Sequence, residues 1–266
     1  MTWPWQSGLR GNAVVLLGEV HDNALLHRQR SAVLRSALQA GWRPALAREQ
    51  FDTDSQSKIE EARRRQPGES ATTVAQRVID RAAGNQSGWD WASYRPFVEL
   101  AVEFDLPLLA ANLARKDANT IVRQGFGAVF DTERLRALGL ADAPSATLQA
   151  AQENEVRIGH CDALPVTLLP AMARAQLARD AVMADLLQRN AATGVVLLAG
   201  NGHARKDIGV PRWLAALPPG RVLSVGYLEE GDSPVPEGSF DAVVRTPRAQ
   251  RADPCEAFLK GRGKPT

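Results

Sequence analysis

The sequence predicts an α/β fold with a mostly parallel central sheet, flanked by helices and carrying a helical subdomain or insertion. Short, continuously apolar runs such as residues 13–18 and 194–200 suit strands that are buried on both faces of a parallel sheet. Helical periodicity separates the strands of the N-terminal half. Between about residues 115 and 190 the periodicity is helical throughout, and no convincing strand is found.

The N-terminal residues predict a strand, a helix and a second strand. After the strand at 13–18, residues 24–40 place apolar side chains at helical spacing, and Gly41 stands where a C-terminal cap belongs. Residues 44–49 predict a weaker strand that we expect to end at Glu49. Together these segments make a βαβ unit.

A largely helical segment then leads to a third strand. Residues 54–84 are polar and rich in arginine and alanine, which favours two short helices, and the Asn-Gln-Ser-Gly stretch at 85–88 breaks them. The apolar positions of residues 96–104 share one helical face. Residues 107–112 follow as the third buried strand, so the α/β alternation is restored.

The C-terminal part returns to strands after the helical segment. Residues 194–200 give the strongest strand signal of the chain. A helix and two strands are predicted after it, at 211–217, 221–227 and 240–245. We expect a single domain over residues 1–250, including the helical insertion, and a disordered tail at 251–266.

Composition excludes several classes of protein. The 266 residues are 44% hydrophobic with a net charge of +2, which is typical of a soluble globular chain and implies no nucleic-acid partner. No window approaches the roughly 18 apolar residues of a spanning helix, so an integral membrane protein is not expected. The chain as given shows no signal or lipobox, which predicts a cytoplasmic protein, or a periplasmic or membrane-anchored one if the start lies elsewhere. Only Cys161 and Cys255 occur, which predicts a reduced protein without a disulfide framework.

Polar residues follow the strand ends, where ligands gather in open parallel sheets. Glu19 and His21 follow the first strand, Glu49 the second, Asn112 the third, and His203 the strand after the helical segment. Two Gly-x-x-His units therefore stand at two strand ends of a chain with four histidines. We expect a compact cluster of two histidines and two glutamates, with the asparagine nearby.

These residue types suit acid–base or metal chemistry. Histidine supplies a base or a metal donor near neutral pH, and carboxylates bind metals, accept protons or orient imidazoles. His21, Glu49 and His203 are the candidate ligands of a divalent metal, although Glu19 and His21 lack the i, i+4 spacing of a helical zinc site. The alternative is that the cluster is only a buried hydrogen-bond network.

Other motifs argue against dinucleotide binding and against catalysis by a serine nucleophile. The glycine-rich stretch 200–205 has Arg205 in place of the third glycine of a dinucleotide fingerprint, and no Gly-x-Ser-x-Gly elbow is present. His27 is expected to pack or cap within its helix. His160 stands beside Cys161 in a predicted turn, where a structural or ligand-contacting role is favoured over a catalytic Cys/His pair.

Short stretches spread in order along the chain match one known family. They are residues 16–22 with His27 and Gln29; Glu49; 89–91 with Tyr94 and Pro96; 110–112; 159–161 with Leu164 and Pro165; Gln176; 179–180; 183–184; 199–203; and 209–211. On these residues the chain resembles the ChaN-like haem-binding uptake proteins of the Tiki superfamily. The resemblance implies an α/β core with a helical subdomain and a haem-binding or iron-handling role.

The resemblance also implies ligands and partners. Haem would be held at a surface or dimer interface by histidine and tyrosine, for which His160 and Tyr94 rank first and Tyr227 is a further phenolate candidate. A homodimer is expected when haem is bound. The wider superfamily includes erythromycin-esterase-like hydrolases and Tiki-type metal-dependent proteases. The alternative function is therefore a hydrolase, metal-dependent or Glu/His-dependent, whose polar centre is the predicted histidine and glutamate cluster.

Overall fold

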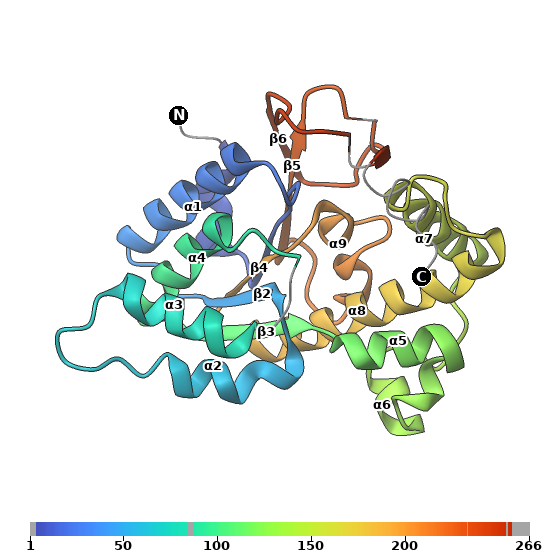
Figure 1. The fold of residues 1–266 in the computed structure, drawn as a ribbon, viewed down its shortest axis with the longest axis horizontal. Coiled ribbons are helices and arrows are strands. Elements are labelled where there is room, and N and C mark those ends of the chain that lie inside the picture. The colour runs from blue at the N-terminus through green and yellow to red at the C-terminus, as the bar shows by residue number, and fades with distance from the viewer. Residues whose placement is uncertain (1–3, 84–87, 233, 254, 257–266) are drawn as a thin grey trace.

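A six-stranded parallel sheet lies at the centre of the molecule (Figure 1). The computed structural model describes residues 4–83, 88–232, 234–253 and 255–256. The order of strands is β3-β2-β4-β1-β5-β6, and every neighbouring pair is parallel. The strands are β1 (Val14–Leu17), β2 (Ala45–Asp52), β3 (Leu108–Asn112), β4 (Val195–Leu198), β5 (Val222–Glu229) and β6 (Ala242–Thr246). The predicted α/β class is confirmed.

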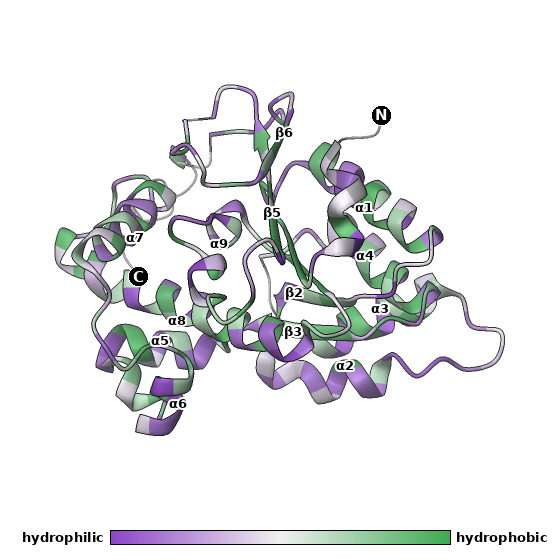
Figure 2. Ribbon diagram, turned by 180° about the vertical axis from the view of Figure 1, so that it is seen from behind, coloured by the Kyte–Doolittle hydropathy of each residue, from purple (hydrophilic) through white to green (hydrophobic). Residues whose placement is uncertain are grey.

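Helices cover both faces of the sheet because successive strand residues point to opposite sides. Val15 and Leu17 of β1 belong to the core on one face, and Val14 and Leu16 belong to the core on the other. The helices of the first face are α1 (Ala24–Gln39), α2 (Gln56–Ala62), α3 (Ala71–Ala82) and α4 (Trp91–Glu103). The second face is covered by α8 (Leu169–Asn190), α9 (Asn201–Ala204) and η5 (Val210–Trp213). Figure 2 shows the central strands as largely hydrophobic, with hydrophilic stretches on the outer helices.

The segment between β3 and β4 is helical and lies largely beside the sheet (Figure 1). Its elements before α8 are α5 (Arg115–Gln124), η3 (Phe126–Ala128), α6 (Thr132–Ala137), α7 (Ala146–Gly159) and η4 (Val166–Leu168). The long helix α8 joins this segment to the sheet, since Ala178 packs among the added helices and Leu187 packs in the sheet core. In the part of the chain that the structure describes, we find no helix long and apolar enough to cross a membrane.

Three elements differ from their predicted bounds. Strand β2 continues to Asp52, with a register shift after Arg48, so Glu49 lies within the strand and not at its end. Helix α4 begins at Trp91 and not at residue 96, because the side chain of Asp90 caps it. The helix expected at 211–217 is only the short turn η5. The break predicted at 85–88 lies mostly outside the described residues.

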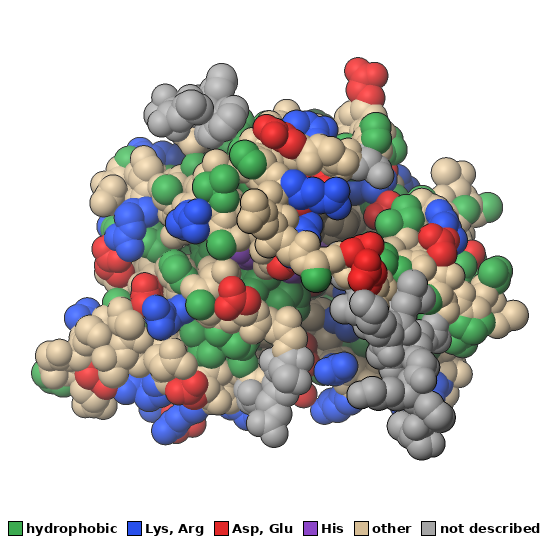
Figure 3. Space-filling view, turned by 45° about the horizontal axis from the view of Figure 1, so that its top comes forward, with side chains coloured by type: hydrophobic (Ala, Val, Ile, Leu, Met, Phe, Trp, Pro, Cys, Tyr) green, Lys and Arg blue, Asp and Glu red, His purple; other side chains and the backbone are tan. Residues whose placement is uncertain are grey.

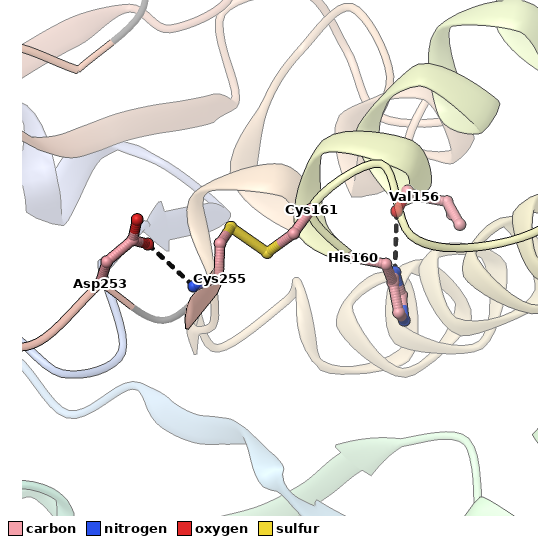
Figure 4. The surroundings of a disulfide bond; sticks show 5 residues. All are labelled: Val156, His160, Cys161, Asp253 and Cys255. Atoms are coloured by element: carbon pink, nitrogen blue, oxygen red, sulfur yellow. Dashed lines mark hydrogen bonds between the residues drawn. A yellow bond between two sulfur atoms is a disulfide. The ribbon is translucent and has the colours of Figure 1, made fainter. Parts of the chain in front are cut away.

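The two cysteines form a disulfide, so the prediction of a reduced protein is wrong. Cys161 follows α7 and Cys255 lies near the C-terminus, at a sequence separation of 94 and with 5.4 Å between their Cα atoms (Figure 4). Two isolated cysteines give no sequence signal for pairing, because the fold alone brings them together. The bond also holds part of the segment that we expected to be disordered, while residues 257–266 lie outside the described part.

Gly209 provides a test of the packing beneath the site. A Cβ at this position would lie 2.4 Å from the backbone oxygen of His203 and 2.5 Å from that of Gly202. We expect Gly209→Ala to lower the free energy of unfolding by about 2 kcal/mol or more, because backbone has to move.

Gly202→Ala is the matched control in the same segment, since its Cβ would meet nothing within 4 Å. Its unfolding free energy should stay within about 1 kcal/mol of the wild type. Urea unfolding followed by circular dichroism measures both variants, and equal stabilities would contradict the described packing.

Candidate functional site

The topology brings together polar residues that lie in or directly after three neighbouring strands, β1, β2 and β4. Strand β4 pairs with both β1 and β2, although it follows them by more than a hundred residues in sequence. The carboxyl ends of these neighbouring strands meet at one edge of the sheet. Glu19 and His21 after β1, Glu49 in β2, and His203 in α9 therefore lie around one site.

Glu19 is the most heavily bonded side chain of the site. Its Oε1 lies 2.8 Å from His21 Nδ1, and it accepts hydrogen bonds from the Tyr94 hydroxyl at 2.7 Å and from Gln50 Nε2 at 3.4 Å. Its Oε2 forms an ion pair with Arg30. Burial alone would raise the pKa of Glu19, but Arg30 and His21 hold the pKa well below its usual range. The carboxylate is therefore ionised at neutral pH.

Two fully buried arginines lie beneath this carboxylate. Arg30 in α1 also donates to the carbonyl oxygen of Leu17, and its guanidinium lies 5.3 Å from the ring centroid of Phe97. Arg48 in β2 lies over the same ring, at 5.1 Å. Burial lowers the pKa of Arg48 to about 10, which leaves it charged at neutral pH. Positive charge under the strand end thus stabilises Glu19 as an anion.

His21 faces the cavity with a fixed orientation. Its side chain is 48% exposed, and its Nδ1 donates to the carboxylate of Glu19, which leaves Nε2 as the nitrogen that can accept a proton. A Cβ on Gly200 would lie 3.1 Å from His21 Nε2, so the glycine allows the imidazole to sit against the backbone. Burial lowers the pKa of His21, but the hydrogen bond to Glu19 and the charge of Glu49 raise it overall.

His203 is held between two carboxylates. Its Nδ1 lies 2.6 Å from Asp180 Oδ1, and its Nε2 lies 3.5 Å from Glu49 Oε1. Burial opposes the charge of His203, but Asp180 and Glu49 raise its pKa to about 10. Glu49 also accepts a hydrogen bond of 2.7 Å from the backbone N–H of Gly200, and its pKa falls to about 2, chiefly through the charge of His203 acting against burial. Both groups are therefore charged at neutral pH.

Asp180 is a site residue to which we assigned no role from the sequence. It lies on α8, 23 residues before His203, and Gln152 of α7 donates to it at 3.3 Å. A buried acid in a long helix has no strand-end signal, so only its place in the family-like stretch 179–180 singled it out. Asn112, which we expected near the cluster, accepts a hydrogen bond from Arg179 and lies farther along the sheet edge.

Two adjoining cavities open around these groups. The larger has a volume of about 740 Å³ and contains His21, His160 and His203 in its wall, and the smaller has a volume of about 310 Å³. Glu49, Gln176 and His203 line both. In Figure 3 histidine side chains are visible at the bottom of a hollow in the middle of the molecule.

The expected haem ligands occupy different surroundings. His160 caps α7 and lines the larger cavity, and its Nδ1 donates to the carbonyl oxygen of Val156 at 2.7 Å (Figure 4). Tyr94 is 1% exposed, and its hydroxyl donates to Glu19. Tyr227 is equally buried. The structure thus places His160 at the cavity and both tyrosines in the protein interior.

The remaining histidine and cysteine assignments also follow from the structure. His27 packs inside α1, with its Nε2 2.9 Å from the carbonyl oxygen of His21 and its ring against Tyr94. Cys161 has no thiol because it is bonded to Cys255, so a catalytic Cys/His pair with His160 is excluded in this state. Figure 4 shows His160 and Cys161 pointing in different directions.

A metal site is not formed by the cluster as it stands. Among the described residues we find no group of three or more His, Cys, Asp or Glu side chains arranged to hold a metal ion. The reason lies in the pairing of the imidazoles. His203 has carboxylates at both nitrogens, and His21 has one at Nδ1, so the histidines and acids bind one another.

Comparison with known proteins assigns the chain to a family. The family model for haem-binding uptake proteins, ChaN, of the Tiki superfamily matches residues 6–214. The chain belongs to this family.

Solved structures show the same fold. ChaN of Campylobacter jejuni, described with cofacial haem binding, has a TM-score of 0.70 at 19% identity, over 90% of this chain and 89% of that one. A mutant of the erythromycin esterase EreC in its open conformation has a TM-score of 0.50 at 15% identity, over 97% of this chain and 82% of that one. At such identities the similarity shows the fold alone. A search of curated proteins gave no match.

The charge of His203 is open to direct measurement. Its folded pKa of about 10 lies above the ordinary 6.5, so its contribution to stability is complete below about pH 6.5 and is lost as the pH rises through about 10. Histidine-selective NMR should show a protonated ring at pH 8. In Asp180→Asn the pKa should fall toward the ordinary value, because the adjacent charge is removed.

Asp185→Asn is the control on the same helix, since Asp185 pairs with Arg134 and Arg189 and not with His203. It should leave the titration of His203 unchanged. A neutral His203 ring at pH 8 in the wild type would contradict the described ion pair.

Proposed function

We propose that this chain binds haem and that His160 is the axial ligand. One observation carries the proposal: His160 lines the largest cavity of the site with its ring orientation fixed by Val156. Because Nδ1 donates this hydrogen bond, the neutral tautomer that it favours has its lone pair on Nε2, and this is the form of imidazole that binds haem iron. Family membership supports the proposal.

The surroundings of His160 suit a flat apolar ligand. Ile158 is 53% exposed, Val166 is 77% exposed and Leu168 is 43% exposed, and all three lie close to His160 in sequence. Apolar side chains beside a histidine ligand are what a haem pocket requires. The larger cavity, with Val156 and Ile208 in its wall, continues this surface inward. When bound, the haem would supply iron-centred ligand exchange, and the protein would supply the ligand and the apolar cover.

A tyrosine ligand fits this geometry less well. Tyr94 would have to leave Glu19 before its oxygen could reach the iron, and burial together with that carboxylate raises its pKa. Burial also raises the pKa of Tyr227 well above its usual range, which disfavours a phenolate. We therefore assign Tyr94 to the orientation of Glu19 and His21, and His160 alone to haem.

A homodimer would explain the exposed apolar residues around His160. In a loaded dimer, a second copy would cover Ile158, Val166 and Leu168 together with the outer face of the haem. Exposed apolar patches commonly mark such interfaces.

The disulfide favours an oxidising compartment for this function. Disulfides persist in exported proteins and are rare in the cytoplasm. The bond between Cys161 and Cys255 directly follows His160, so an oxidised protein has the haem ligand fixed to the C-terminal segment. We therefore propose a compartment outside the reducing cytoplasm.

Hydrolysis is a second candidate, favoured by the orientation of His21. With Glu19 at Nδ1, its Nε2 faces the cavity beside Glu49, as a general base for water requires. His203 and Glu49 would then position the substrate, and a divalent metal held by His21, Glu49 and His203 would require their present ion pairs to separate. Loss of turnover in His21→Ala, with haem binding retained, would establish this function separately.

Haem titration tests the leading proposal. In an absorption titration with haemin, the wild type should give a saturable, shifted Soret band. His160→Ala should weaken binding by about tenfold or more, because the axial bond is lost. His160→Gln can still donate to Val156 and should lose haem to the same extent while keeping the local fold.

His21→Ala is the control within the same cavity and should bind haem within about twofold of the wild type. Light scattering on the same samples would report the dimer. Loss of the Soret shift in His21→Ala and its retention in both His160 variants would overturn the assignment.

A further inference from the structure

Charged side chains of both signs line the smaller cavity. Its wall contains two carboxylates, Glu49 and Asp52, and two guanidinium groups, Arg115 and Arg179, with His203 at the boundary to the larger cavity. These groups come from β2, α5, α8 and α9, so four separate elements converge on a space of about 310 Å³.

The two carboxylates of this wall already have partners. Glu49 accepts from the backbone N–H of Gly200 at 2.7 Å and faces His203. Asp52 accepts from the backbone N–H of Arg115 at 3.1 Å, which caps the first turn of α5. Neither carboxylate forms an ion pair with a guanidinium of the cavity among the described residues.

The two arginines, by contrast, are not held by a direct ion pair among the described residues. Arg179 is partly buried, and its Nη1 donates to Asn112 Oδ1 and, at 3.5 Å, to the carbonyl oxygen of Leu113. In the part of the chain that the structure describes, neither Arg179 nor Arg115 has a carboxylate within ion-pair distance. By comparison, the buried Arg205 forms ion pairs with both Glu155 and Asp207. Burial lowers the pKa of Arg179, and Glu49, Asp52 and Asp180 offset this only from beyond ion-pair distance, so a bound anion in direct contact would stabilise the guanidinium further.

We propose that the smaller cavity binds the carboxylate of an organic acid, which Arg179 and Arg115 hold beside His203. A planar carboxylate matches the donor geometry of a guanidinium. A doubly charged phosphate fits less well, because Glu49 and Asp52 line the same wall and would repel it. Trp89 gives the remaining wall an aromatic face, which suits an aromatic or otherwise flat acid.

The acid could be a separate small molecule or the propionate of a haem that extends past His203. The two cavities adjoin at Glu49, Gln176 and His203, so both sources reach the same arginines. The carboxylate site does not depend on the haem proposal, since the first source needs no haem.

Isothermal titration calorimetry with benzoate tests the site on the full chain without haem. The wild type should bind benzoate more tightly than inorganic phosphate, and Arg179→Gln should weaken benzoate binding by about tenfold or more. Arg115→Gln, at an exposed position that tolerates change, should weaken it severalfold and remains informative if Arg179→Gln fails to fold. Arg81→Gln, in a surface pair with Glu61, is the matched control and should bind as the wild type does.

A second titration identifies the source of the acid. If haemin binds more tightly than its dimethyl ester and Arg179→Gln removes that difference, the site is supported and the acid is a haem propionate. If benzoate binds but the ester binds as haemin does, the site is supported and the acid is a separate molecule. Three results would overturn the proposal. Benzoate could bind equally to the wild type and both cavity variants, or the wild type could prefer phosphate to benzoate. The third is that benzoate does not bind and that haemin and its dimethyl ester bind alike. A missing Soret shift with intact benzoate binding would reject haem binding alone.

Discussion

The buried ion pair of Glu19 and Arg30 is the constraint on which the site depends. Arg30 donates both to this carboxylate and to the last residue of β1, so it fixes the point where the chain leaves the sheet. The anion then orients His21 and Tyr94 through its other oxygen. Because breaking a buried pair leaves an uncompensated charge, this arrangement resists loss of either partner. The second ion pair, between His203 and Asp180, fixes the neighbouring strand end in the same way.

The paired charges also make one end of the larger cavity polar, whereas its other end is more apolar. At the sheet edge the imidazoles and carboxylates satisfy one another, so this part is polar, ordered and suited to orienting water or a polar substrate. At the end of α7 the wall includes the apolar side chains of Val156 and Ile158, and His160 donates to the backbone carbonyl oxygen of Val156. The function we propose places haem at the end of α7 and leaves acid–base chemistry to the sheet edge.

The sequence predicted what depends on local pattern. Continuous apolar runs identified the parallel strands, and the two glycine–histidine units located His21 and His203 at strand ends. Long-range partners could not be predicted this way. Asp180 sits in the middle of a helix, and Tyr94 reaches Glu19 across 75 residues, so neither contact leaves a local pattern. The disulfide is a similar case, because its cysteines meet only after the C-terminal segment folds back onto α7. Even the bounds of α4 depended on one cap, Asp90, which outweighed the proline inside the helix.

The most direct test of a haem site at His160 is the effect of bound haem on the four histidine rings. Ferric haem is paramagnetic and broadens the NMR signals of nuclei close to the iron, whereas zinc protoporphyrin is a diamagnetic control. In histidine-selective spectra, haemin should remove the signals of His160 while those of buried His27 persist, and zinc protoporphyrin should remove neither. Preferential loss of the His21 and His203 signals, with His160 unaffected, would place the iron at the polar centre and contradict the account.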